Sequence, residues 1–162
     1  MKIKVINGPN LNFLGIREKG IYGSRTYDDL VSYIQDFCDF EQIEVSFFQS
    51  NHEGALIDTI QSCYGEYDGI VINPGGYTMT SVALLDAVRA VAIPTVEVHI
   101  SDMDKREPFR KISYIGLACI KIISGHGFDG YLEAIREIIN NKNNQKTDAI
   151  IKSNETNECL RP

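Results

Sequence analysis

His99 and the glutamate two positions before it form the residue pair with the most evident chemistry. The segment Pro94–His99 reads PTVEVH, an apolar run typical of a buried strand. Side chains two positions apart in a strand project to the same side, so Glu97 can accept a hydrogen bond from the His99 ring. Such a bond fixes the tautomer and raises the basicity of the other ring nitrogen. The pair therefore predicts a general acid or base, with a purely structural histidine at a strand end as the alternative.

The residues after His99 are suited to hold an anion. The backbone N–H groups of Ile100 and Ser101 can form a small nest for a carboxylate. Arg106 and Arg110 follow in the same loop and supply two cations for an anionic or polyhydroxylated ligand. A solvated, charged turn is the alternative for these two arginines.

A second candidate pair lies in the loop from Asn10 to Gly23, which is longer than the ~2–6 residues usual between a strand and a helix. Long ordered loops of this kind often act as lids over a site. Arg17 and Tyr22 are close enough in sequence for a turn to bring the guanidinium beside the phenol. A nearby cation lowers the pKa of a tyrosine toward that of a useful base. A surface arginine and a packing tyrosine are the alternative.

The elements that position these residues follow from the hydrophobic pattern, in which short apolar runs alternate with segments of helical period. Thr26 and Asp29 form a predicted capping box at the start of the first helix. Five strands alternating with helices indicate a parallel sheet covered on both faces, with ligands bound at the carboxyl ends of the strands. The predicted strands are Ile3–Asn7, Ile43–Gln49, Tyr67–Asn73, Pro94–His99 and Leu117–Ser124; the predicted helices are Thr26–Phe40, Glu53–Tyr64, Thr80–Val91 and Phe128–Ile139.

The segment Gly125–Gly130 reads GHGFDG and matches the GxGxxG pattern of dinucleotide sites. That fingerprint requires a second strand ending in an acidic residue about 20 positions on, and the sequence predicts no strand there. The glycines therefore indicate a tight turn that needs positive φ angles. A nucleotide-binding module of flavodoxin-like fold remains a weaker alternative.

Composition bounds the class of protein. The 162 residues (18.2 kDa) predict one catalytic domain over residues 1–140 and a polar, mobile tail over 141–162. A net charge of −6 argues against partners such as nucleic acid or an anionic membrane surface. No apolar run approaches the ~20 residues of a membrane span. The four cysteines are scattered without metal-binding spacing, which predicts reduced thiols and a cytoplasmic location.

Four segments resemble the type II 3-dehydroquinate dehydratase family over Lys2 to Ile139, in the same order. They read INGPNLNFLGIREKGIYG, NPGGYTMTSVALLDA, PTVEVHIS and REPFR. The resemblance implies a flavodoxin-like three-layer α/β sandwich with a five-stranded parallel sheet. It also implies trans-elimination of water from 3-dehydroquinate, giving 3-dehydroshikimate in the shikimate pathway. The family needs no metal, cofactor or Schiff base for this reaction.

Carried onto matching positions, the resemblance assigns the catalytic roles. Tyr22 would be the base that removes the C2 proton, with Arg17 lowering its pKa. A water held by polar groups such as Asn10 would help to stabilise the enolate. His99, oriented by Glu97, would protonate the departing C1 hydroxyl.

The resemblance also assigns the substrate-binding roles. Asn73 and the amides of Ile100 and Ser101 would hold the hydroxyl and carboxylate end of the substrate. Arg110 would contact the far hydroxyls of the ring. Asp86 would do so from a neighbouring subunit, because the family forms homo-oligomers built from trimers, commonly dodecamers.

The chain departs from the family pattern at a substrate-binding position, where Met79 replaces the usual histidine. Because the chemical groups are retained, we expect substrate affinity or assembly to differ rather than the reaction class. A weakened relative that binds a cyclic carboxylate or a partner without turnover is the alternative function. The other departures from residues common in the family are Leu85, Asp102, Ile120, Lys121 and His126.

Overall fold

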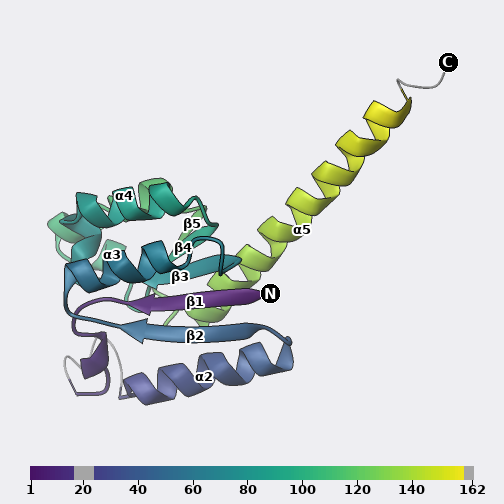
Figure 1. Cartoon of the computed structure of the whole chain (residues 1–162). Helices are drawn as coiled ribbons and strands as arrows, with labels where there is room; N and C mark the ends of the chain where they lie inside the picture. Colours follow the sequence, from purple (N-terminus) through teal and green to yellow (C-terminus); the bar gives the residue numbers. More distant parts are fainter. Residues whose placement is uncertain (17–23, 159–162) are drawn as a thin grey trace.

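Five parallel strands form one sheet in the computed structural model of the chain (Figure 1). The structure describes the backbone of residues 1–16 and 24–158, and the side chains of these residues except 146 and 148–158. The strand order is β2-β1-β3-β4-β5, which is the flavodoxin-like order, so the predicted fold class is confirmed. The strands are β1 (Lys2–Asn7), β2 (Glu44–Gln49), β3 (Gly69–Asn73), β4 (Thr95–His99) and β5 (Lys121–Ser124).

Helices cover both faces of this sheet and complete a three-layer sandwich (Figure 1). On one face, α2 (Tyr27–Phe40) and α5 (Asp129–Glu158) bury a core that includes Leu30, Ile34 and Ile135. On the other face, α3 (Glu53–Ser62) and α4 (Val82–Val91) bury a second core. Each fully buried aliphatic side chain stabilises the fold by roughly 1.5–3 kcal/mol. Short 3-10 helices connect these elements: η1 (Leu11–Phe13), η2 (Gly75–Met79), η3 (Met103–Lys105), η4 (Pro108–Lys111) and η5 (Ile115–Ala118).

The start of α2 has the predicted capping box. The Thr26 hydroxyl accepts a hydrogen bond from the Asp29 amide at 3.1 Å, and the Asp29 carboxylate accepts one from the Thr26 amide at 2.7 Å. These bonds satisfy two N–H groups that lack partners within the helix. The bond from the Thr26 amide also lowers the pKa of Asp29.

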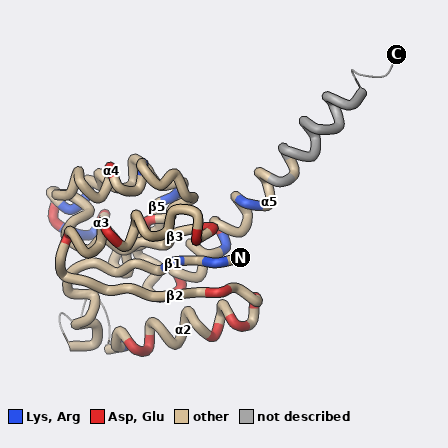
Figure 2. The backbone as a smooth tube through the Cα atoms, viewed as in Figure 1, with Lys and Arg blue, Asp and Glu red and all other residues tan. Residues whose placement is uncertain are grey.

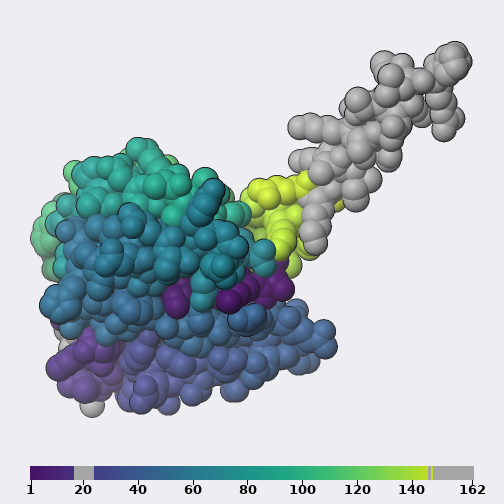
Figure 3. All heavy atoms as spheres, in the orientation of Figure 1, coloured from purple at the N-terminus to yellow at the C-terminus, as the bar shows by residue number. Residues whose placement is uncertain are grey.

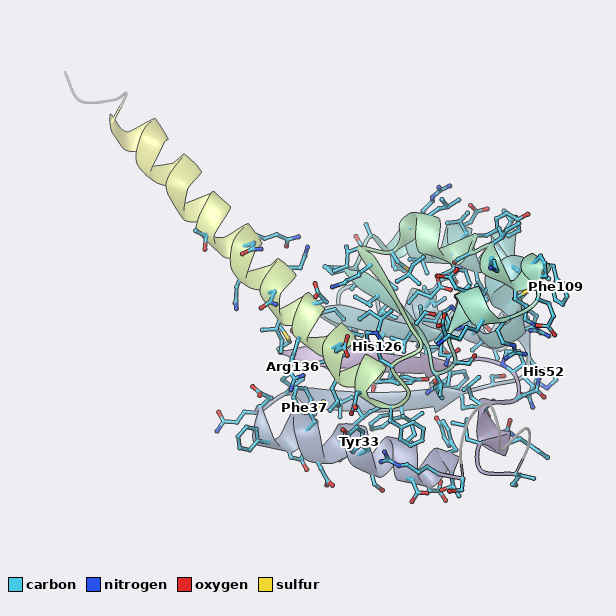
Figure 4. The ribbon with its side chains drawn as sticks, turned by 180° about the vertical axis from the view of Figure 1, so that it is seen from behind. Tyr33, Phe37, His52, Phe109, His126 and Arg136 are labelled. Carbon is cyan, nitrogen blue, oxygen red and sulfur yellow. The ribbon has the colours of Figure 1, made fainter. Side chains whose placement is uncertain are left out.

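Farther along α2, the Arg136 guanidinium of α5 stacks over the Phe37 ring, with its Cζ atom 4.9 Å from the ring centroid, where the two helices meet (Figure 4).

The fifth strand begins later than predicted. Residues 115–118 form η5, and only Lys121–Ser124 are strand, so the predicted start at Leu117 is wrong. Ile115 is fully buried whereas Leu117 is 68% exposed, which is the pattern of a single helical turn. A short apolar run does not by itself distinguish a strand from such a turn.

The last helix extends past its predicted end at Ile139. Beyond that residue, Lys142 forms an ion pair with Asp68 at 2.5 Å, and Asp68 also accepts a 2.8 Å hydrogen bond from the backbone amide of Lys2. The hydrogen bond from Lys142 lowers the pKa of Asp68. These contacts hold α5 beside the start of β1, where the two segments lie together in Figure 3. The extension is polar and lacks the apolar stripe from which a helix is predicted; a separate tail over 141–162 stays a prediction.

The glycine-rich segment is a tight turn between β5 and α5, as predicted. Gly125 has a φ of 86° and Gly127 a φ of 58°, which L side chains rarely adopt. A Cβ on Gly125 would also lie 3.0 Å from the Cβ of Asp102. The glycines therefore meet a steric requirement of the fold.

The described residues include an acidic surface on α2 and three buried or half-buried cysteines. Acidic residues recur along the exposed side of α2 (Figure 2). Among the described residues, no helix is long and apolar enough to cross a membrane. Cys38, Cys63 and Cys119 are free thiols. Burial raises the pKa of Cys38 and Cys63 to about 11 and that of Cys119 to about 12, so all three stay protonated at neutral pH.

Candidate active site

A cavity of about 300 Å³ opens at the carboxyl ends of β1, β3 and β4. Strands β1 and β3 lie at the point where the strand order reverses, which is where open α/β sheets bind ligands. Figure 4 shows Phe109 of η4 at this end of the molecule, to which the strands point. The lining residues are Pro9, Asn10, Leu11, Asn73, Gly75, Gly76, Met79, His99, Ile100, Ser101, Met103, Arg106, Glu107 and Arg110.

The predicted Glu97–His99 pair forms at the edge of this cavity. The Nε2 atom of His99 lies 2.7 Å from the Oε1 atom of Glu97. Glu97 is fully buried, whereas His99 is 8% exposed and lines the cavity. The other carboxylate oxygen, Oε2, accepts a hydrogen bond from the hydroxyl of Ser113 at 2.5 Å.

The geometry of this pair assigns the proton positions on the ring. An ionised carboxylate only accepts hydrogen bonds, so His99 Nε2 must carry the proton that Glu97 receives. The atom Nδ1 is then the ring nitrogen that Glu97 does not engage. This second nitrogen can take up a proton or give one to a bound ligand. His99 can therefore deliver a proton to a leaving group in the cavity.

Asn73 enters the cavity at the end of β3 and is fixed from both sides of its amide. Its Oδ1 accepts a hydrogen bond from the Gly75 amide at 3.2 Å, and its Nδ2 donates to the Tyr131 hydroxyl at 3.0 Å. The Tyr131 hydroxyl in turn donates to Oδ1 of Asn7 at 2.7 Å. Burial raises the pKa of Tyr131, so this hydroxyl remains a donor at neutral pH. The network joins the ends of β1 and β3 beneath the cavity.

Removing that hydroxyl should destabilise the protein. Tyr131→Phe leaves the buried amides of Asn7 and Asn73 without their shared partner, which we expect to lower the free energy of unfolding by ~1–3 kcal/mol. Urea denaturation followed by circular dichroism measures this difference. Tyr64→Phe removes a hydroxyl from a side chain that is 73% exposed and serves as the control. Equal unfolding free energies for the two variants would contradict the structural role of the network.

Asn10 reaches the cavity from the loop after β1. Its φ of 68° is a left-handed conformation that asparagine tolerates better than most residues. Its backbone amide donates to Oδ1 of Asn51 at 2.9 Å, and the backbone oxygen of Asn51 accepts from the Tyr77 hydroxyl at 3.0 Å. The loop after β2 and the 3-10 helix η2 thus hold Asn10 at the cavity.

Two arginines and one glutamate line the side of the cavity formed by η4 and the loop before it. The Oε2 atom of Glu107 lies 3.0 Å from Nε of Arg110 and 3.4 Å from Nε of Arg106. A hydrogen bond from its own backbone amide lowers the pKa of Glu107, and the two guanidinium groups act in the same direction. Glu107 was not predicted as a site residue. It holds the two cations beside each other at the cavity.

The structure brings most of the predicted site residues together. Glu97 lies directly behind His99. Asp86 is exposed on α4 and does not line the cavity within this described chain. Arg17 and Tyr22 fall outside the described residues. Within the described ranges, no group of three or more His, Cys, Asp or Glu side chains could hold a metal ion. The predicted residues that line the cavity are Asn10, Asn73, Met79, His99, Ile100, Ser101 and Arg110.

Two supporting residues could not be found from the sequence. Ser113 contacts Glu97 across 16 positions, and Tyr131 contacts Asn73 across 58 positions. No local periodicity connects residues at such separations. The only sequence signal is that Tyr131 is a polar side chain at a core position of the last predicted helix.

Comparison with known families identifies the family of the chain. A model of the class II dehydroquinase family matches residues 1–139. The chain belongs to this family. Two curated relatives named 3-dehydroquinate dehydratase, from Fusobacterium nucleatum subsp. nucleatum and Clostridium acetobutylicum, are 56% and 54% identical to it. Each alignment covers 86% of this chain and 97% of the relative.

Solved structures of class II dehydroquinases also match the fold. The type II dehydroquinase from Butyrivibrio crossotus superposes with a TM-score of 0.84 at 54% identity, covering 85% of this chain and 97% of that one. The enzyme from Propionibacterium acnes gives 0.81 at 33% identity, covering 85% and 96%. Family membership leaves the nucleotide-binding alternative without support.

Proposed function

We propose that this chain catalyses the trans-elimination of water from 3-dehydroquinate, giving 3-dehydroshikimate in the shikimate pathway. The observation that carries the proposal is the Glu97–His99 pair. It lies at a cavity of ligand size at the carboxyl edge of the sheet, in a member of the class II dehydroquinase family. The reaction needs a base for the C2 proton, a stabiliser for the enolate and an acid for the departing hydroxyl.

The first step forms the enolate. Tyr22 would remove the C2 proton as a phenolate, and the Arg17 guanidinium would favour that phenolate over the phenol. Both assignments rest on the family motif, because these residues lie outside the described part of the chain. Asn10, which lines the cavity, would hold the water that hydrogen-bonds to the enolate oxygen.

The second step expels water. As the C1–O bond breaks, its electrons leave with the oxygen, which needs a proton to depart as neutral water. His99 would supply that proton from Nδ1, while Glu97 accepts a hydrogen bond from Nε2 at 2.7 Å. The bond to Glu97 also holds the plane of the imidazole fixed during the transfer.

The remaining cavity residues suit a polyhydroxylated carboxylate. The amides of Ile100 and Ser101 would bind its carboxylate, and Asn73 a ring hydroxyl. Arg110 would contact the far hydroxyls, with Glu107 keeping the guanidinium in place through a 3.0 Å ion pair. An anionic substrate is compatible with an acidic protein because these local donors set the field in the cavity.

A direct assay tests the proposal. Adding the purified protein to 3-dehydroquinate should raise the ultraviolet absorbance, because the product contains a conjugated enone. A protein that binds the substrate but shows no turnover at saturation would instead favour the weakened relative that binds without catalysis. Glu97 and His99 are present and paired, so this described part of the site favours catalysis over binding alone.

The substitution at Met79 should weaken binding. Its thioether lines the cavity and cannot donate the hydrogen bond that an imidazole would give to a substrate hydroxyl. A lost bond of this kind costs ~0.5–1.5 kcal/mol, a few-fold to roughly tenfold in affinity. We expect Met79→His to lower KM with a smaller change in kcat, and Met79→Leu to keep the KM of the parent chain. Steady-state kinetics on folded protein decides; an unchanged KM in Met79→His would contradict the interpretation.

We further propose that the chain forms a homo-oligomer built from trimers, such as the dodecamer that is common in the family. The segment 109–122 exposes several large apolar side chains, among them Phe109 (59%) and Leu117 (68%), which a neighbouring copy could cover. Asp86 would then complete the cavity of the adjacent subunit. Sedimentation analysis should give a mass that is a multiple of three 18.2 kDa chains, and a monomer at micromolar concentration would refute the proposal.

A cytoplasmic location is part of the same proposal. The three described cysteines are free thiols. Free thiols are typical of a reducing compartment, because an oxidising one would favour their pairing or oxidation. Fluorescence microscopy of a tagged chain in its host tests the location directly.

A further inference from the structure

The buried carboxylate of Glu97 has one side-chain partner on each oxygen. His99 Nε2 lies 2.7 Å from Oε1, and the Ser113 hydroxyl lies 2.5 Å from Oε2. Glu97 is fully buried and out of reach of bulk water. Its Oε2 atom therefore depends on the Ser113 hydroxyl for a hydrogen bond. A carboxylate held by two donors has little freedom to rotate.

The proton of the Ser113 hydroxyl has a fixed direction. The Oγ atom accepts a hydrogen bond from the backbone amide of Gly116 at 2.8 Å, and a hydroxyl has a single proton to donate. That proton is therefore directed at Glu97. The result is one connected network: the Gly116 amide donates to Ser113, and Ser113 and His99 each donate to one oxygen of the Glu97 carboxylate.

The backbone at Gly116 lies directly against this network of bonds. A Cβ at Gly116 would lie 2.9 Å from the Ser113 oxygen, 3.0 Å from Oε2 of Glu97 and 2.3 Å from Cδ1 of Ile122. A larger residue could not occupy this position without displacing one of these groups. The absence of a side chain at Gly116 thus lets the backbone of η5 pack against the Ser113 hydroxyl and the Glu97 carboxylate.

We propose that Ser113 is a positioning residue that holds Glu97 and thereby orients and tunes His99, the acid of the proposed reaction. The inference rests on the proposed function. The hydrogen bond from Ser113 withdraws negative charge from the carboxylate. Without it, more of that charge would act on the His99 ring, hold its proton more tightly and make it a weaker acid. The carboxylate would also be free to turn away from the ring.

A purely structural role for Ser113 predicts something different. If the hydroxyl only closes the turn into η5 by accepting the Gly116 amide, its loss should affect stability alone. Ser81 provides a matched case, because its hydroxyl accepts the Leu84 amide at 2.9 Å, also three residues ahead, at the start of α4. Ser113→Ala and Ser81→Ala both remove an acceptor of one backbone amide, but only the first removes a donor to Glu97.

The kinetic test compares these variants with Ser113→Thr, which keeps the hydroxyl. We expect Ser113→Ala to lower kcat about tenfold or more with little change in KM, and to move the basic limb of the kcat–pH profile to higher pH. We expect Ser113→Thr to regain most of the activity and Ser81→Ala to retain the kcat of the parent chain. If Ser113→Ala does not fold, Ser113→Cys, which donates only weakly, should show the same loss to a smaller degree. A folded Ser113→Ala with parental kcat and pH profile would overturn the proposal.

A second readout is independent of turnover. The chain has only three histidines, His52, His99 and His126, so their ring signals can be assigned in an NMR titration by single substitutions. The titration midpoint of His99 should rise in Ser113→Ala and stay in place in Ser81→Ala. A midpoint of His99 that is the same in all variants would refute the role of Ser113. This measurement needs no substrate, so it separates a failure of this inference from a failure of the proposed reaction.

Discussion

Replacing His99 with alanine is expected to lower kcat by roughly 10²–10⁴-fold, the usual contribution of a general acid. His99 lines the cavity and is paired with a buried carboxylate, so it combines a fixed ring orientation with access to the substrate. Its loss removes the proton that the departing hydroxyl needs. The fold should persist, because both hydrophobic cores and the sheet are formed by other residues.

A second variant separates chemistry from stability at this position. In His99→Ala the Oε1 atom of Glu97 loses its only side-chain donor among the described residues, which is itself costly when the group is buried. His99→Gln keeps an amide donor near that oxygen but has no titratable proton. We expect both variants to lose kcat to a similar extent and His99→Gln to be the more stable in thermal unfolding. Near-parental kcat in His99→Gln would rule out His99 as the acid.

Tyr22→Phe is expected to remove turnover to a similar degree. The change deletes one oxygen, the atom that would take the C2 proton, and a phenylalanine ring has no other group that could act as a base. Substrate binding should be retained, because the groups proposed to hold the substrate belong to other residues, which line the cavity. Comparison of kcat with that of Tyr64→Phe, which alters an exposed tyrosine, controls for the loss of a hydroxyl as such. A Tyr22→Phe variant with near-normal kcat would remove Tyr22 from the mechanism.

The parts of the fold that sequence predicts are those set by local pattern. The two-residue spacing of Glu97 and His99 correctly predicted that their side chains meet, because a strand alternates its faces at every residue. The spacing of Thr26 and Asp29 likewise predicted both bonds of the cap. The glycines at 125 and 127 predicted a turn with positive φ.

The parts that sequence did not predict depend on contacts between distant segments. The start of β5 was wrong because η5 is an apolar turn whose exposed Leu117 looks like a strand residue in the sequence. The support of Glu97 by Ser113 and of Asn73 by Tyr131 exists only once β4, η5 and α5 have packed. The extension of α5 past Ile139 has polar residues and no periodic apolar face.

The central claim is that a separate base removes the C2 proton, whereas His99 protonates the departing hydroxyl. Deuterium incorporation at C2 tests this claim most directly. His99→Gln is incubated with 3-dehydroquinate in deuterated water, and the unreacted substrate is examined by proton NMR. If His99 is only the leaving-group acid, the base still forms the enolate, so deuterium should enter at C2 while almost no 3-dehydroshikimate appears. Rapid formation of 3-dehydroshikimate by this variant, or a substrate that gains no deuterium at C2, would contradict the account.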